Sequence, residues 1–182
     1  LLALRAQGKL RKALVVGIDN AGADRSREFA PQLALERLPE KLRHRGLGAE
    51  GVTLLGESYL QFIVEELKPF VDGRYRTRPG PDSTLLMGSS LGGMVSIYAL
   101  ARHPQVFGAA ACLSTHWPIS LPPDLVPEAQ AMSGACLDWL AETLPRAGSH
   151  RLYFDHGDQG LDAFYGPFQS RMDAIASAKG YA

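Results

Sequence analysis

Two adjacent serines, Ser89 and Ser90, lie among glycines in the stretch GSSLGG. Gly88, Ser90 and Gly92 match the pattern Gly-x-Ser-x-Gly. The stretch follows an apolar run and precedes a helical pattern, the context in which a serine is held on a sharp strand-to-helix turn called a nucleophile elbow. Glycines two places before and after the serine leave room for that turn, because side chains there would collide. Ser90 is therefore the predicted nucleophile, whereas Ser89 is one place out of register.

The helix predicted after Ser90 adds an electrostatic effect. The first amides of a helix have no intrahelical acceptor and carry partial positive charge. The amide of Leu91 is thus the predicted donor to an oxyanion that develops on a substrate carbonyl. The alternatives are a glycine-rich turn without chemistry and a phosphate cradle. A Walker-type phosphate loop would have a lysine after its second glycine, and this stretch has none.

Apolar runs and helical patterns alternate along the chain, and this alternation predicts the elements that position Ser90. Strands are predicted over residues 13–18, 83–88, 106–114 and 151–155, and helices over residues 58–71, 91–103, 131–144 and 168–179. Such alternation is typical of a parallel sheet with helices on both faces. The predicted fold class is α/β, in a single domain over residues 1–182.

Composition and charge exclude several classes of partner and site. The 182 residues carry 19 basic and 19 acidic side chains without a basic stripe, which disfavours nucleic acid as a partner. No apolar run approaches the roughly 18 residues of a membrane span. The two cysteines, Cys112 and Cys136, are too few for a disulfide framework and lack metal-ligand spacing, so no metal site is predicted. The compartment, cytoplasmic or exported, and a homo-oligomeric state are left open.

The stretch GSSLGGMVSIYALARHPQVFGAAACLSTHW resembles an esterase family of the α/β-hydrolases. That family groups esterase D-like enzymes, feruloyl and acetyl-xylan esterases, and enterochelin-type siderophore esterases. The resemblance extends to VVGIDNAGADRSREFAP, YLQFIVEELKPFVDGRYRT and YFDHGDQGLDAFYGPFQ, and so covers nearly the whole chain. It implies the α/β-hydrolase fold and a Ser–Asp–His catalytic triad. It also implies hydrolysis of small-molecule carboxylic esters through an acyl-enzyme at Ser90, without a cofactor.

Three aspartates follow the last predicted strand, in the stretch RLYFDHGDQGLD. In this fold the triad acid lies in a loop after a strand beyond the nucleophile. Asp155 is still on the strand and is expected to have a structural role. The family pattern, a Gly-Thr-like step followed a few residues later by aspartate, implies Asp162 as the acid, with Asp158 as the second choice.

The triad histidine should follow the acid in the chain. The last histidine of the sequence, His156, precedes both candidate acids. The chain also begins without Met, and the resemblance implies further strands before residue 13. We therefore expect these residues to be the middle of a longer esterase that lacks both flanks, with the catalytic histidine beyond Ala182. We expect little hydrolysis from these residues alone.

The remaining candidates concern substrate binding and rival functions. His116 and Trp117 follow a predicted strand and are expected to rim the pocket, where Trp117 would stack on an aromatic or sugar ring. The alternative is that Trp117 covers the core. Arg25 follows the first predicted strand and would bind a carboxylate or catecholate, or else pair with Glu28 at a helix start. An acyltransferase and a non-catalytic binding module on the same fold are the alternative functions.

Overall fold

A three-stranded parallel sheet forms the centre of the structure, a computed structural model that describes residues 2–9, 12–47, 53–118 and 126–181. The strands are β1 (Leu85–Ser89), β2 (Ala109–Leu113) and β3 (Arg151–Asp155), in the spatial order β1-β2-β3. Their last residues are in register, because Ser89 pairs with Leu113 and Leu113 with Asp155. The loops that follow the three strands therefore begin side by side.

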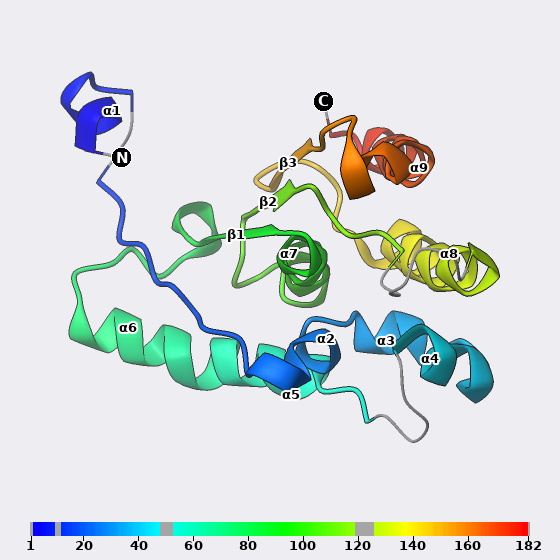
Figure 1. Ribbon diagram of the computed structural model, residues 1–182. Coiled ribbons are helices and arrows are strands. Elements are labelled where there is room, and N and C mark those ends of the chain that lie inside the picture. Colours follow the sequence, from blue (N-terminus) through cyan, green and yellow to red (C-terminus); the bar gives the residue numbers. More distant parts are fainter. Residues whose placement is uncertain (1, 10–11, 48–52, 119–125, 182) are drawn as a thin grey trace.

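The helix α7 (Leu91–Arg102) lies against one face of β1 and β2 (Figure 1). Met94, Ile97 and Leu100 of this helix are each 0% exposed, so α7 is the centre of the hydrophobic core. The helix ends just before Pro104, since the residue preceding a proline disfavours helical angles. Next to α7 lies α8 (Val126–Thr143), and α9 (Gly166–Ala178) packs on α8.

A long helical rod runs beneath α7 in Figure 1. It consists of α5 (Gly56–Gln61), a π-helical segment η2 (Phe62–Leu67) and α6 (Lys68–Arg74). Glu57 ties the rod to α7, because its carboxylate accepts a hydrogen bond from Tyr98 and lies 2.7 Å from the guanidinium of Arg102. This helix was predicted from residue 58, and its buried residues include Leu60 and Ile63.

The remaining elements are short. They are α1 (Leu2–Ala6), η1 (Gly22–Asp24), α2 (Arg25–Glu28), α3 (Gln32–Leu35), α4 (Glu40–Leu47), η3 (Pro81–Ser83) and η4 (Gly160–Phe164). Both α3 and α4 pack against α8, and α2 packs against α5. In Figure 1, α1 stands apart from the rest of the molecule. Within the described ranges, no helix combines the length and apolar character needed to cross a lipid bilayer.

The strand predicted over residues 13–18 is wrong. In the structure this segment is an extended, unpaired chain that leads from α1 to α2 (Figure 1). Val15 is 71% exposed and Val16 is 43% exposed. A single extended segment has nowhere to place its backbone donors and acceptors except water, so it gains no stability as a strand. Among the described residues, the outer edge of β1 also has no strand partner.

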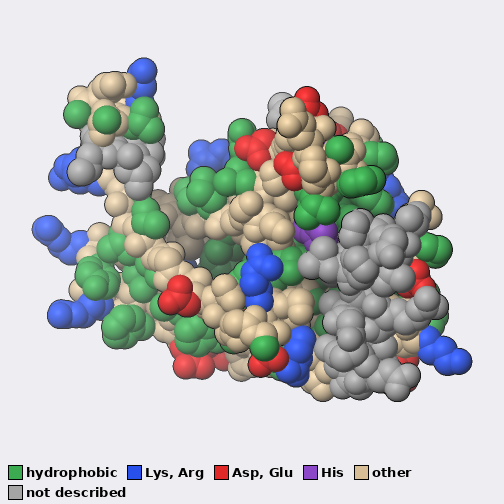
Figure 2. Space-filling model, viewed as in Figure 1, with side chains coloured by type: hydrophobic (Ala, Val, Ile, Leu, Met, Phe, Trp, Pro, Cys, Tyr) green, Lys and Arg blue, Asp and Glu red, His purple; other side chains and the backbone are tan. Residues whose placement is uncertain are grey.

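Helices were predicted on both faces of the sheet, but no element among the described residues covers the second face. Leu85, Met87 and Tyr153 project from it and are 63%, 68% and 56% exposed. On the opposite face, Ala110 and Cys112 of the central strand are 2% and 0% exposed. Hydrophobic side chains accordingly appear on the surface beside the sheet and over α6 (Figure 2). The core thus lies on one side of the sheet, between the strands and the helices.

Candidate active site

Ser90 joins β1 to α7 at a strained turn. Its φ and ψ angles are 59° and −124°, outside the regions that most non-glycine residues occupy. The Ser90 amide donates to the carbonyl of Leu113 at 2.9 Å, and the Ser90 carbonyl accepts from the amides of Gly93 and His116 at 3.0 and 3.2 Å. The turn is therefore held from both sides, by the end of β2 and by the first turn of α7. The strained backbone predicted for Ser90 is confirmed.

The glycines around Ser90 are not equivalent. A Cβ atom on Gly88 would lie 2.3 Å from the carbonyl oxygen of Gly92, whereas a Cβ on Gly92 would meet no atom within 4 Å. Glycine was predicted to be necessary at both positions, but the close contacts make it necessary only at Gly88. A Cβ on Gly93 would lie 2.7 Å from Oγ1 of Thr115, so Gly93 allows α7 to pack closely on the segment after β2.

Leu91 is the first residue of α7, and its amide has no acceptor within the helix. The predicted role of the Leu91 amide as a donor to an oxyanion requires this placement. The role itself stays a prediction. Ser89 is the last residue of β1 and is exposed in line with Leu85 and Met87, on the uncovered face of the sheet. Ser90, by contrast, is the residue between β1 and α7 and is half-buried.

Asp162 lies in η4, in the loop after β3. Its Oδ2 atom accepts a hydrogen bond from the amide of Gly157 at 2.7 Å and another from the hydroxyl of Ser114 at 2.8 Å. These two bonds, the Gly157 bond foremost, hold the pKa of Asp162 below its ordinary value. Asp158 is exposed in the bend before η4. Of the two candidate acids, Asp162 is therefore the one whose carboxylate is shown to accept hydrogen bonds in the described part of the chain.

Asp155, the last residue of β3, has a structural contact. Its carbonyl oxygen accepts a hydrogen bond from the amide of Ser114 at 2.9 Å, and its Oδ1 atom lies 3.2 Å from the same amide. The structural role predicted for Asp155 is thus confirmed, since it holds the segment that follows β2.

The two histidines that follow strand ends differ in environment. His116 is 4% exposed, and its Nδ1 atom lies 2.7 Å from the hydroxyl oxygen of Tyr165. The two rings meet edge to face, with 5.8 Å between their centroids. His156 is exposed, and its Nδ1 atom lies 2.7 Å from the carbonyl oxygen of Gly157. His116 therefore adjoins the Ser90 turn through its backbone, and its ring contacts Tyr165, the residue before α9.

Trp117 is a core side chain. It is 1% exposed, its indole nitrogen donates to Gln169 at 3.0 Å, and its ring lies 6.2 Å from that of Phe154. A ring that stacks on a substrate needs an accessible face, so this burial favours the alternative in which Trp117 covers the core.

Arg25 lies on α2, where its guanidinium is 5.4 Å from the centre of the Phe29 ring. The ion pair formed at this helix start joins Arg27 to Asp24 at 2.6 Å, and Glu28 accepts a hydrogen bond from the amide of Ala21. The pairing considered between Arg25 and Glu28 is therefore replaced by other partners, and binding of an anion by Arg25 stays a prediction.

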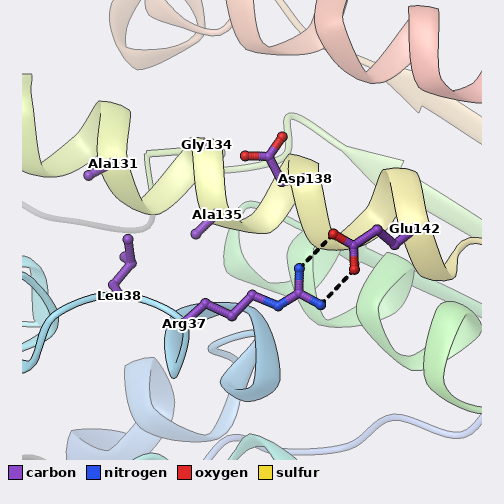
Figure 3. A pocket seen from close by; sticks show the side chains of 7 residues that line it. All are labelled: Arg37, Leu38, Ala131, Gly134, Ala135, Asp138 and Glu142. Carbon is purple, nitrogen blue, oxygen red and sulfur yellow. Dashed lines mark hydrogen bonds and ion pairs between the residues drawn. The ribbon is translucent and has the colours of Figure 1, made fainter.

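A cavity of about 480 Å³ lies elsewhere, between α8 and the chain that follows α3 (Figure 3). Its lining residues are Arg37, Leu38, Ala131, Gly134, Ala135, Asp138 and Glu142. Arg37 and Glu142 face each other across it and form two hydrogen bonds of 2.9 and 2.8 Å. None of the residues predicted for the active site lines this cavity.

Three residues in contact with predicted site residues were not predicted from the sequence, namely Ser114, Gly157 and Tyr165. Ser114 and Ser90 are the two non-glycine residues with positive φ in the part of the chain that the structure describes. The available signal was position, because Ser114 directly follows β2 just as Ser90 directly follows β1. A polar residue at the carboxyl end of a parallel strand is a candidate site residue in such folds.

Comparison with protein families matches residues 3–171 to the family described as "Putative esterase". The chain belongs to this esterase family. The match confirms the resemblance seen in the sequence, and it spans both the Ser90 turn and the Asp162 loop.

Two individual proteins are similar to this member of the esterase family. A solved structure of a ferulic acid esterase aligns with a TM-score of 0.50 at 17% identity, over 68% of this chain and 51% of that one. This likeness confirms the α/β fold. The "Uncharacterized protein YbbA" of Bacillus subtilis (strain 168) is 30% identical over 64 residues, which are 35% of this chain and 26% of that protein. The chain thus spans about half of the solved relative.

Proposed function

We propose that the protein hydrolyses small-molecule carboxylic esters, with Ser90 as the nucleophile and Asp162 as the acid of a Ser–Asp–His triad. The observation that carries the proposal is the strained turn at Ser90, between a parallel strand and a buried helix. Such strain costs free energy, and it persists where function requires it. Membership of the esterase family supports the choice of ester substrates.

In the first half of the reaction, Oγ of Ser90 attacks the ester carbonyl carbon while a histidine accepts the hydroxyl proton. The carbonyl oxygen becomes an oxyanion, and the amide of Leu91 donates to it. Collapse of this intermediate breaks the bond between the carbonyl carbon and the alkoxy oxygen. The alcohol leaves with the proton from the histidine, and the acyl group stays on Ser90.

In the second half, water attacks the acyl-enzyme with the same histidine as base, which releases the acid and restores Ser90. Asp162 orients that histidine and stabilises its charged form. The depressed pKa of Asp162 keeps its carboxylate ionised at neutral pH, as this role needs. The chain order Ser, acid, His that is usual in this fold supports a histidine that follows Asp162 in the sequence.

The test is turnover of p-nitrophenyl acetate by the full-length protein and two serine variants. Ser90→Ala is expected to lower kcat/KM by about 10⁴-fold, because the attacking oxygen is gone. Ser89→Ala is the matched control, since it removes the neighbouring hydroxyl on the uncovered face of the sheet. Its kcat/KM should stay within about twofold of the wild type.

A fluorophosphonate probe provides the second measurement, because it reacts covalently with an activated serine. Labelling of Ser90 in the wild type and in Ser89→Ala, and its loss in Ser90→Ala, is the expected pattern. Equal turnover by Ser90→Ala and wild type would remove the proposal and favour the binding module. Addition of an alcohol acceptor then separates hydrolysis from acyl transfer, which would yield a new ester.

A further inference from the structure

Ser114 occupies a position between the proposed nucleophile and the proposed acid. It follows β2, the central strand of the sheet. The residue before it, Leu113, accepts a hydrogen bond from the amide of Ser90, and the amide of His116 donates to the carbonyl of Ser90. Residues 113–116 therefore contact Ser90 through backbone atoms on one side.

On its other side the same segment contacts the chain around β3. The amide of Ser114 is held by Asp155, at 2.9 Å from the carbonyl oxygen and 3.2 Å from Oδ1. The hydroxyl of Ser114 donates to Oδ2 of Asp162 at 2.8 Å. The backbone of Ser114 is thus fixed by the end of β3, and its side chain reaches the carboxylate in the following loop.

The conformation of Ser114 is a costly one. Its φ angle is 41°, in the left-handed region that glycine and asparagine adopt more readily than serine. A glycine would relieve the strain, but it would have no hydroxyl to give to Asp162. Strain retained at a residue whose side chain anchors a carboxylate indicates that the hydroxyl itself is needed.

The geometry at Asp162 shows what the hydroxyl does. The Ser114 hydroxyl and the Gly157 amide both donate to Oδ2, at 2.8 and 2.7 Å. Two donors on one oxygen fix the direction of the carboxylate and do not engage Oδ1. A histidine nitrogen can then donate to Oδ1 from a defined direction, as the acid of a triad requires.

We propose that Ser114 is a positioning residue that holds the carboxylate of Asp162 at a fixed place relative to Ser90. This proposal rests on the proposed function, since it assigns a role in the same triad. Ser114 does not touch the substrate. It acts through Asp162, and so its removal should slow the chemical steps and leave substrate binding almost unchanged.

The experiment uses the full-length protein with two substitutions, Ser114→Gly and Ser114→Ala. Both remove the hydroxyl, but glycine accepts the positive φ angle and alanine does not. Ser114→Gly is expected to lower kcat for p-nitrophenyl acetate about 10- to 100-fold, with KM within about threefold of the wild type. Ser114→Ala should lose at least as much, and circular dichroism should show both variants folded.

A double variant separates positioning from general support of the fold. If Ser114 acts through Asp162, then Ser114→Gly should cause no further loss of kcat when added to Asp162→Asn, since the two residues act as one unit. Independent losses that multiply would overturn the proposal. So would a Ser114→Gly variant whose kcat stays within twofold of the wild type.

A measurement independent of activity is the pKa of the Asp162 carboxyl group, followed by carbon NMR. It should rise in Ser114→Gly because a donor to the carboxylate is lost. An unchanged pKa would overturn the proposal even if kcat fell. Unchanged activity in Ser90→Ala would contradict the proposed function itself. If activity depends on Ser90 but is unchanged in Ser114→Gly, only the proposed role of Ser114 is contradicted.

Discussion

Two apolar stretches of this chain adopt different structures, one as an unpaired segment and the other as a paired strand. Residues 13–18, with the sequence ALVVGI, are rich in β-branched side chains, yet they form an exposed and unpaired segment. The strand β1, with the sequence LLMGS, has no β-branched residue and contains a glycine, yet it is a regular strand. The difference is that β1 pairs with β2 and packs on α7. Pairing and packing, rather than intrinsic preference, decide which stretch becomes a strand.

The largest loss of stability is expected from a substitution at the end of β1. Gly88→Ala places a Cβ atom 2.3 Å from the carbonyl oxygen of Gly92, and backbone at that distance has to move. We expect the free energy of unfolding to fall by about 3 kcal/mol and the Ser90 turn to lose its geometry. Urea unfolding measures the first effect, and fluorophosphonate labelling of Ser90 measures the second.

Gly92→Ala is the control for that substitution. Its Cβ atom would meet no other atom within 4 Å, and alanine favours a helix more than glycine does. The urea midpoint should therefore stay the same or rise slightly. Equal destabilisation by both substitutions would show that the crowding at this turn is not centred on Gly88.

A smaller loss of stability is expected at Glu57, which links α5 to Tyr98 and Arg102 of α7. Burial raises the pKa of Glu57, but the hydrogen bonds from Arg102 and Tyr98 outweigh it, so the pKa lies below the ordinary value. A lowered folded-state pKa stabilises the protein above the unfolded-state value, and this stability is lost as the pH falls through the folded-state value. The loss should therefore be seen as the pH falls below about 4.5.

Glu57→Gln tests that contribution through urea unfolding at several pH values. We expect a loss of about 1 kcal/mol at pH 7, since the ion pair is partly exposed and screened, and a flatter dependence on pH in the acid range. Glu142→Gln removes the carboxylate of the exposed pair with Arg37 and should have a smaller effect. A steeper acid dependence in Glu57→Gln than in the wild type would contradict the assignment.

The smallest effect is expected in the unpaired segment. Val15 is 71% exposed, so Val15→Ser should change the free energy of unfolding by less than about 0.5 kcal/mol. Val95 on α7 is 8% exposed, and Val95→Ser should cost about 2 kcal/mol in the same urea experiment. Similar losses at the two valines would mean that residues 13–18 are packed after all.

Much of the fold could be predicted from the sequence, because its elements are local patterns. The strand over residues 151–155 and the helix from Leu91 have the predicted bounds to within a residue, and a proline marks the end of that helix. What could not be predicted depends on partners distant in the sequence. The pairing that residues 13–18 lack and the bare face around Met87 are examples.

The candidate site likewise has features that could be predicted from neighbouring residues and features that depend on distant ones. The turn at Ser90 could be predicted, because its glycines and its place between strand and helix are neighbours in the sequence. The burial of Trp117 depends on Gln169 and Phe154, and the anchoring of Asp162 depends on Ser114, 48 residues away. Contacts of this kind have no local signal, so a single sequence does not reveal them.

The bare side of the sheet has a consequence for work with this polypeptide in solution. Apolar side chains such as Met87 and Tyr153 stand next to the unpaired backbone of an edge strand, and these are the two ingredients of intermolecular strand addition. Aggregation then competes with folding and becomes stronger with concentration. Dilute protein and a mild detergent are therefore sensible starting conditions for these 182 residues.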